Sequence, residues 1–119
     1  MPGQTPNLAM NPVVIVHLLA AATAIVAAVP LIQRRVKMNH WYGVRIPASF
    51  VSDEAWFDLN RYGGRLLLVW GLSIAATGLV GAFLKKRDWI AYDWVALVII
   101  MGGLALVMAK IYRYVSDPQ

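Results

Sequence analysis

Three long apolar windows constrain the fold of this chain more than any other feature of its sequence. They cover about residues 13–32, 66–84 and 89–108, and none of them contains Lys or Arg. A helix that spans a bilayer needs about 20 predominantly apolar residues. Backbone groups in lipid must also bond to one another, which favours helices. The sequence therefore predicts an all-α membrane protein with three transmembrane helices, in which residues 13–119 form a single three-helix domain.

The segment before the first window, residues 1–12, is rich in proline and amide side chains and is predicted to be flexible. It contains no Lys or Arg, whereas a secretory signal peptide has a positively charged start. We therefore expect the first window to be a retained helix and not a cleaved signal.

The distribution of basic residues predicts how the chain is oriented in the membrane. Positive residues are concentrated in cytoplasmic loops. Eight basic residues fall on one side of the predicted helices: Arg34, Arg35, Lys37, Arg45, Arg61, Arg65, Lys110 and Arg113. Only Lys85, Lys86 and Arg87 fall on the other. We expect a multi-pass protein of the bacterial inner membrane, with the N-terminus outside and the C-terminus in the cytoplasm.

Composition excludes several functional classes. The net charge of +5 is explained by contacts with the phospholipid bilayer, so no nucleic-acid partner is expected. The chain has no cysteine and two histidines, without a cluster of His, Asp and Glu, so neither a metal site nor a cofactor is predicted. No nucleophile motif such as GxSxG occurs. We predict no catalytic residue and no enzymatic activity.

The first connector, residues 39–65, is the one long polar stretch and mixes aromatic residues with Asn, Arg and carboxylates. This composition predicts a folded cap. Ser52 is placed as a helix N-cap, with two acids in the first turn. An amphipathic helix is expected from about Asp53 to Tyr62. The Gly63–Gly64 pair is either a hinge to the next helix or a kink in one helix of about thirty residues.

Small residues recur at helical spacing in the first two apolar windows. The first carries Ala20, Ala24 and Ala28, and the second carries Gly71, Ala75, Gly78 and Ala82. Such faces allow close helix contact in membranes. They can pack within this chain, in a homo-oligomer, or in a larger membrane complex of which this chain is a small accessory subunit.

Two ionisable residues lie within the apolar windows. Intramembrane ionisable groups are functional candidates, so His17 and Asp93 support the alternative of an oligomeric transporter or channel. We favour a structural role for His17, as a neutral imidazole bonded to a neighbouring helix or lying at interface depth. Asp93 is expected at headgroup depth or paired with Lys85 or Arg87.

The connector resembles the signature of the SdpI/YfhL family of small bacterial membrane proteins. The matching positions are Asn39, Tyr42, Gly43, Arg45, Pro47, Ser52, Glu54, Trp56, Asn60, Arg61, Gly63 and Gly64. The family's named member protects a bacterium from its own secreted peptide toxin and holds a transcriptional repressor at the membrane. The resemblance implies immunity or signalling, although this chain has fewer predicted helices than that member.

Eight connector residues are the candidate site for a peptide or protein partner or a lipid headgroup: Asn39, Tyr42, Arg45, Glu54, Trp56, Asn60, Arg61 and Arg65. Arginine offers planar donors that match phosphate and carboxylate groups. The competing interpretation is a purely structural cap, in which Arg45 pairs with Glu54 or, failing that, with Asp58.

Overall fold

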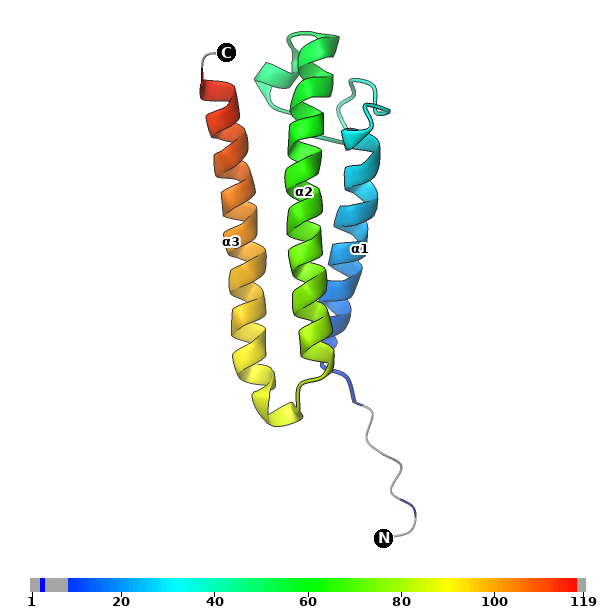
Figure 1. Ribbon diagram of the computed structural model, residues 1–119, viewed down its shortest axis with the longest axis vertical. Coiled ribbons are helices and arrows are strands. Elements are labelled where there is room, and N and C mark those ends of the chain that lie inside the picture. The colour runs from blue at the N-terminus through cyan, green and yellow to red at the C-terminus, as the bar shows by residue number, and fades with distance from the viewer. Residues whose placement is uncertain (1–2, 4–8, 118–119) are drawn as a thin grey trace.

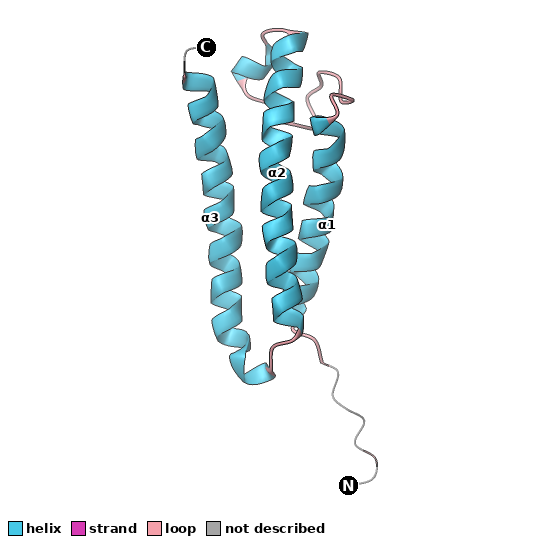
Figure 2. Cartoon of the chain, viewed as in Figure 1, coloured by secondary structure: helices cyan, strands magenta, loops and turns pink. Residues whose placement is uncertain are grey.

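The computed structural model describes residues 3 and 9–117, and this part of the chain contains helices but no strand (Figures 1 and 2). The long helices are α1 (Pro12–Ile32), α2 (Asp53–Ala82) and α3 (Trp89–Ser116). Two short 3-10 helices, η1 (Pro47–Phe50) and η2 (Lys86–Asp88), lie in the connectors. All three long helices are long and apolar enough to cross a membrane. The predicted all-α architecture with three membrane helices is confirmed.

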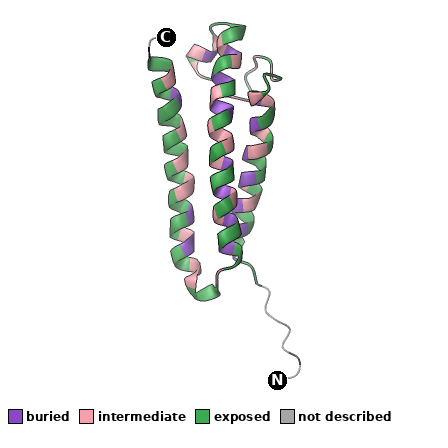
Figure 3. Cartoon of the chain, viewed as in Figure 1, coloured by how far each residue is buried: buried purple, intermediate pink, exposed green. Residues whose placement is uncertain are grey.

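Helices α1 and α2 pack closely because small residues face one another along their contact. A Cβ added to Gly71 would lie 3.1 Å from the Cβ of Ala24, and one added to Gly64 would lie 3.2 Å from the Ala28 carbonyl oxygen. Figure 3 shows buried residues where α1 and α2 meet and exposed residues on the outer faces. Gly71 and Gly78 of the predicted α2 face pack on α1, whereas Ala75 is half-buried and Ala82 is exposed, so this face was only partly predicted. The third buried alanine of α1 is Ala21, since Ala20 is only half-buried.

Helix α2 runs without a break through Gly63 and Gly64, which decides between the two alternatives for this pair. The glycines allow close packing: a Cβ on Gly63 would overlap the Val44 side chain, and Gly64 lies against Leu31 and Ile32. Thirty residues of helix are about 45 Å long, whereas the hydrocarbon core is about 30 Å thick. The predicted amphipathic helix, Asp53–Tyr62, is the first part of α2. Helix α2 is long enough for this part to extend beyond the hydrocarbon core.

Helix α3 is longer than expected, and it contacts α2 near both of its ends as well as at Gly103, which lies against Trp70. Near its start, the Tyr92 ring lies against Gly81 and its hydroxyl donates to the Thr77 carbonyl at 3.0 Å. Near its other end, Tyr114 donates to Asp58. The helix ends at Ser116 and not near residue 108, so Lys110 and Arg113 are helical.

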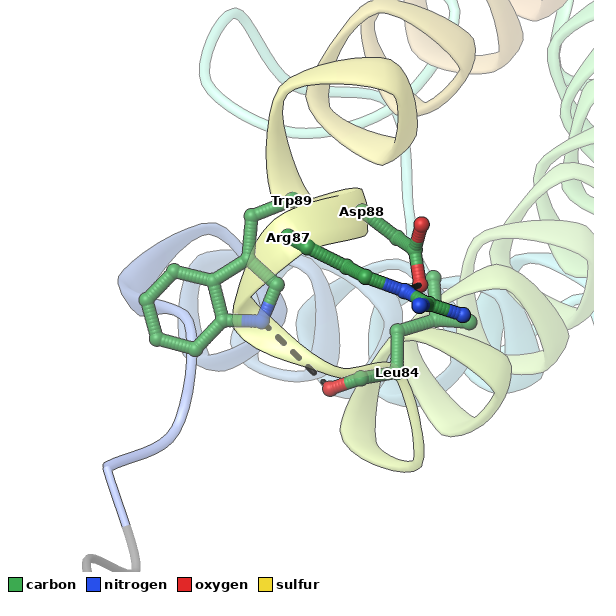
Figure 4. Close-up of polar contacts among 4 residues, drawn as sticks. All are labelled: Leu84, Arg87, Asp88 and Trp89. Atoms are coloured by element: carbon green, nitrogen blue, oxygen red, sulfur yellow. Dashed lines mark hydrogen bonds and ion pairs between the residues drawn. The ribbon is translucent and has the colours of Figure 1, made fainter.

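The turn between α2 and α3 is closed by contacts within the turn itself (Figure 4). Arg87 pairs with Asp88 at 3.5 Å, and the Trp89 indole donates to the Leu84 carbonyl at 3.4 Å.

The predicted pairing of Asp93 with Lys85 or Arg87 is wrong. The Asp93 carboxylate instead accepts from the Asn11 side chain at 2.8 Å, because the start of α1 lies beside the first turns of α3.

Asn11 has a second contact that fixes where α1 begins. Its side-chain oxygen accepts from the Val13 backbone N–H at 3.0 Å, which makes it the N-cap. The predicted flexibility of residues 1–12 falls largely on residues outside the described part. Within that range, Asn11 is buried and Pro12 is the first helical residue.

Replacing Asn11 with alanine is expected to lower the free energy of unfolding by about 1–2 kcal/mol, because the first turn of α1 loses its cap. Thermal unfolding in mild detergent measures this loss. Asn11→Ser retains a capping oxygen but is too short to reach Asp93, so it should recover most of the stability. An Asn11→Ala curve that superimposes on that of the wild type would contradict the capping role.

Candidate functional site

The first turn of the connector is organised by one amide side chain. The Asn39 oxygen accepts from the backbone N–H groups of Trp41 and Tyr42, at 2.8 and 2.7 Å, and its amide nitrogen donates to the Lys37 carbonyl at 2.7 Å. Asn and Asp form such local turns because their short polar side chains mimic the backbone. Asn39 therefore shapes the chain and has its hydrogen-bonding capacity used locally.

A second amide side chain attaches the connector to α2. Asn60 is 1% exposed, and its oxygen accepts from the Val44 N–H at 2.6 Å while its nitrogen donates to the Trp56 carbonyl at 2.9 Å. Gly43 lies directly over this amide with φ +114, and a Cβ at that position would overlap the Asn60 oxygen. The glycine is needed both for the backbone conformation and for the close approach.

Two aromatic candidates also point inward. Trp56 is fully buried, and its indole N–H donates to the Val36 carbonyl at 2.8 Å. The Phe50 ring lies 5.5 Å from it and stacks in turn on His40. The Tyr42 hydroxyl donates to the Ala27 carbonyl of α1, and burial raises the pKa of this hydroxyl. These aromatic side chains hold the connector against the ends of α1 and α2.

The charged candidates point outward. Arg45, Glu54, Arg61 and Arg65 are all exposed. Glu54 borders a shallow hollow of about 340 Å³ with Arg34 and Asp58, and this hollow contains no other predicted site residue. The eight candidates therefore do not converge on one pocket. Four of them, Asn39, Tyr42, Trp56 and Asn60, build the scaffold, and the other four lie on its surface.

The predicted ion pair between Arg45 and Glu54 or Asp58 is wrong. The Arg45 guanidinium donates to the His40 carbonyl at 2.5 Å. The extended residue Ile46 and helix η1 carry the chain between Arg45 and the start of α2. The charges are also exposed to solvent, where an unpaired carboxylate costs little.

Across the part of the chain that the structure describes, a single ion pair lies within 4.0 Å, and it joins Arg87 to Asp88 at the opposite end. Arg45, Arg61 and Arg65 therefore have no carboxylate partner among residues 3 and 9–117. Figure 1 shows the connector and the C-terminus at the same end of the helices, so all eight basic residues of the richer side gather there. This end carries an excess of positive charge.

Sequence reasoning missed three contacts at this end. The Tyr114 hydroxyl donates to Asp58 at 2.6 Å, and its ring stacks on Tyr62 with centroids 4.1 Å apart. Arg34 lies over the Phe57 ring at 5.3 Å, which is a cation–π distance. Tyr114 is 56 residues from its partner, and no local signal in the sequence connects the two.

His17 is buried, with 3% of its surface exposed. Its Nδ1 lies 3.1 Å from the Val13 carbonyl of its own helix, so the first of the two predicted alternatives, a bond to a neighbouring helix, is wrong. Its Nε2 has no hydrogen-bond partner among the residues that the structure describes, and its ring centroid lies 6.3 Å from that of Tyr92. Within the same described residues, no three His, Cys, Asp or Glu side chains come together as a metal site. The transporter or channel alternative stays a prediction that rests on His17 and Asp93.

Three apolar helices and a connector locked onto two of them define a small helical membrane protein with an arginine-rich end. The chain belongs to the SdpI/YfhL protein family, whose family model matches residues 35–113. This match extends beyond the connector through α2 and most of α3. Comparison with curated proteins and with solved structures found no match.

Proposed function

We propose that this protein is an inner-membrane docking protein of the immunity and signalling type, and that it is not an enzyme. In this proposal Arg45, Arg61 and Arg65 bind an acidic group on a peptide or protein partner, with the connector and the C-terminus in the cytoplasm. This proposal rests on the observation that these arginines are exposed and have no carboxylate partner in the part of the chain that the structure describes, although Glu54 and Asp58 lie in the same connector.

The scaffold supports binding because it is held in place before a partner arrives. Arg45 follows Val44, whose N–H is bonded to the buried Asn60, and Arg61 follows Asn60 itself. Arginines on a fixed backbone lose less entropy on binding than arginines on a mobile loop. A guanidinium also binds carboxylate or phosphate through two parallel hydrogen bonds.

A phospholipid headgroup is the second candidate ligand for the same arginines. Trp41 supports it, because its side chain is 87% exposed and lies in the connector beside the basic residues. Tryptophan is enriched at the membrane interface, where its ring lies among the headgroups. A connector that binds headgroups would lie against the membrane surface and leave few arginines for a partner.

Protection against a secreted peptide toxin tests the proposed function. A toxin-sensitive bacterium that expresses the wild type should survive, and the variant Arg45→Gln/Arg61→Gln/Arg65→Gln should lose at least tenfold of this protection. Arg45→Lys/Arg61→Lys/Arg65→Lys keeps the positive charge that sets the orientation of the protein in the membrane, but lysine cannot form the bidentate hydrogen bonds of a guanidinium. It should give intermediate protection.

The matched control is Lys85→Gln/Lys86→Gln/Arg87→Gln, which removes three charges at the opposite end and should protect like the wild type. A C-terminal reporter fusion verifies that each variant is present and keeps its orientation. Equal protection by Arg45→Gln/Arg61→Gln/Arg65→Gln and by this control would contradict the arginine site. A wild type that protects against no related toxin would contradict the immunity function.

A further inference from the structure

An apolar groove lies between helices α2 and α3. The groove has a volume of about 590 Å³ and is lined mainly by aliphatic side chains, among them Leu66, Val69, Ile99 and Leu106. This volume falls within the range of ligand sites, about 300–1,000 Å³. The groove lies on the α3 side of α2, away from α1.

The polar groups of the groove wall are largely satisfied within the chain. The Ser73 and Thr77 hydroxyls donate to the carbonyls of Val69 and Ser73 in their own helix, both at 2.9 Å. The Trp70 indole nitrogen is buried without a partner in the described structure, and a Cβ on Gly103 would overlap it. The Trp70 side chain and Gly103 both line the groove, although the indole nitrogen itself is buried. Apart from Lys110, the rest of the described wall offers no free hydrogen-bond donor, which suits a hydrocarbon chain.

The groove becomes positively charged at one end. Lys110 lines both the groove and an adjoining hollow of about 260 Å³, which is completed by Tyr62, Arg113, Tyr114 and Asp117. Neither Lys110 nor Arg113 makes an ion pair within the described residues, and Asp117 is the one carboxylate in the hollow. Asp58 adjoins the hollow through its bond with Tyr114, and Arg65 also lies near Tyr114. Three cations beside two carboxylates still leave a positive excess, which favours an anionic ligand.

The length of the groove agrees with one membrane leaflet. Eleven residues separate Ile99 from Lys110, which is about 16 Å along a helix. Half of a hydrocarbon core of about 30 Å is about 15 Å. An acyl chain that lies in the groove therefore places its phosphate at the depth of Lys110 and Arg113.

We propose that the α2–α3 groove binds one anionic phospholipid from the leaflet at the connector end, with an acyl chain between the helices and its phosphate at Lys110 and Arg113. Lys110 and Arg113 are not among the connector arginines of the proposed function. The complementarity between an apolar groove with a cationic mouth and a lipid with an anionic headgroup identifies the occupant. A second copy of the chain would satisfy the apolar part but leave the two cations unmatched.

Native mass spectrometry of the full chain in mild detergent tests this site. Phosphatidylglycerol and phosphatidylcholine with identical acyl chains are added in turn, and the population of the one-lipid complex is compared. The wild type should retain phosphatidylglycerol about tenfold better, since each basic residue near the surface strengthens binding of anionic lipid. Lys110→Gln/Arg113→Gln should abolish this preference, whereas Lys85→Gln/Lys86→Gln should keep it.

A groove-filling variant, Val107→Trp, should lower retention of both lipids at least fivefold while the unfolding temperature of the protein stays within a few degrees. No preference in the wild type, or a preference unchanged in Lys110→Gln/Arg113→Gln, would overturn the site. If the preference for phosphatidylglycerol is lost only in Arg45→Gln/Arg61→Gln/Arg65→Gln, the headgroup binds at the connector, and this result would also overturn the proposed site. A dimer that forms in place of the lipid complex would show that a second copy fills the groove. Toxin protection by Lys110→Gln/Arg113→Gln should be unchanged, which separates this result from the proposed function.

Discussion

Replacing Trp56 with alanine is expected to lower the free energy of unfolding by about 3–5 kcal/mol, the range for removing a large buried aromatic side chain. The indole is fully buried, and its loss also leaves the Val36 carbonyl without its donor. The free energy is measured by denaturant unfolding in detergent micelles. Hydrogen exchange should show that the amides of Trp41, Tyr42 and Val44 become less protected, because the connector loses its anchor.

Trp41→Ala is the matched control, since it removes the same side chain from a position that is 87% exposed. A surface change of this kind is expected to stay within about 0.5 kcal/mol of the wild type. Equal losses from the two variants would contradict the arrangement in which one tryptophan is an anchor and the other a free surface group.

Gly43→Ala is expected to have an effect of comparable size from a much smaller chemical change. The φ of +114 places an L-residue under strain of about 1–3 kcal/mol, and the new Cβ would displace the Asn60 oxygen. The partly buried Val44 N–H would then lose its acceptor, at a further cost of about 1 kcal/mol. Thermal unfolding should show a marked drop, accompanied by fast exchange of the Val44 amide.

Gly102→Ala provides the control, because Gly102 lies on the exposed face of α3 with no atom near its missing Cβ. Alanine favours a helix over glycine by about 1 kcal/mol, so this variant should match or exceed the wild type in stability. A Gly43→Ala protein as stable as Gly102→Ala would show that the connector does not adopt the described conformation.

The helices and their caps could be predicted because their signals are local. Long apolar runs identified the three membrane helices, and Ser52 with its two acids identified the start of α2, where the Ser52 hydroxyl accepts from the Ala55 N–H at 3.0 Å. The end of α3 was missed, since hydropathy reports the lipid-embedded part of a helix and not the turns that continue into water. Residues after 108 mix charged and aromatic side chains and give no apolar signal.

The candidate site was only partly predictable, because the roles of its residues depend on distant partners. Asn60 and Arg61 are neighbours in the sequence and were given the same role, but they lie on different faces of α2: Asn60 is buried against Val44, and Arg61 is exposed. Arg45 was assigned a carboxylate partner on the assumption that charges beside the membrane must pair. The extent to which each side chain is exposed decides this question, and it cannot be read from spacing alone.

The unbroken course of α2 has a mechanical consequence. The segment that carries Asn60 and Arg61 belongs to the same rod as the segment that contacts Tyr92 near the opposite end of the helices. Along a rod of about 45 Å, a tilt of about 5° at one end displaces the other by about 4 Å. A ligand that tilts α2 at the connector would therefore also displace the turn between α2 and α3. One rigid helix would transmit the movement from one side of the membrane to the other.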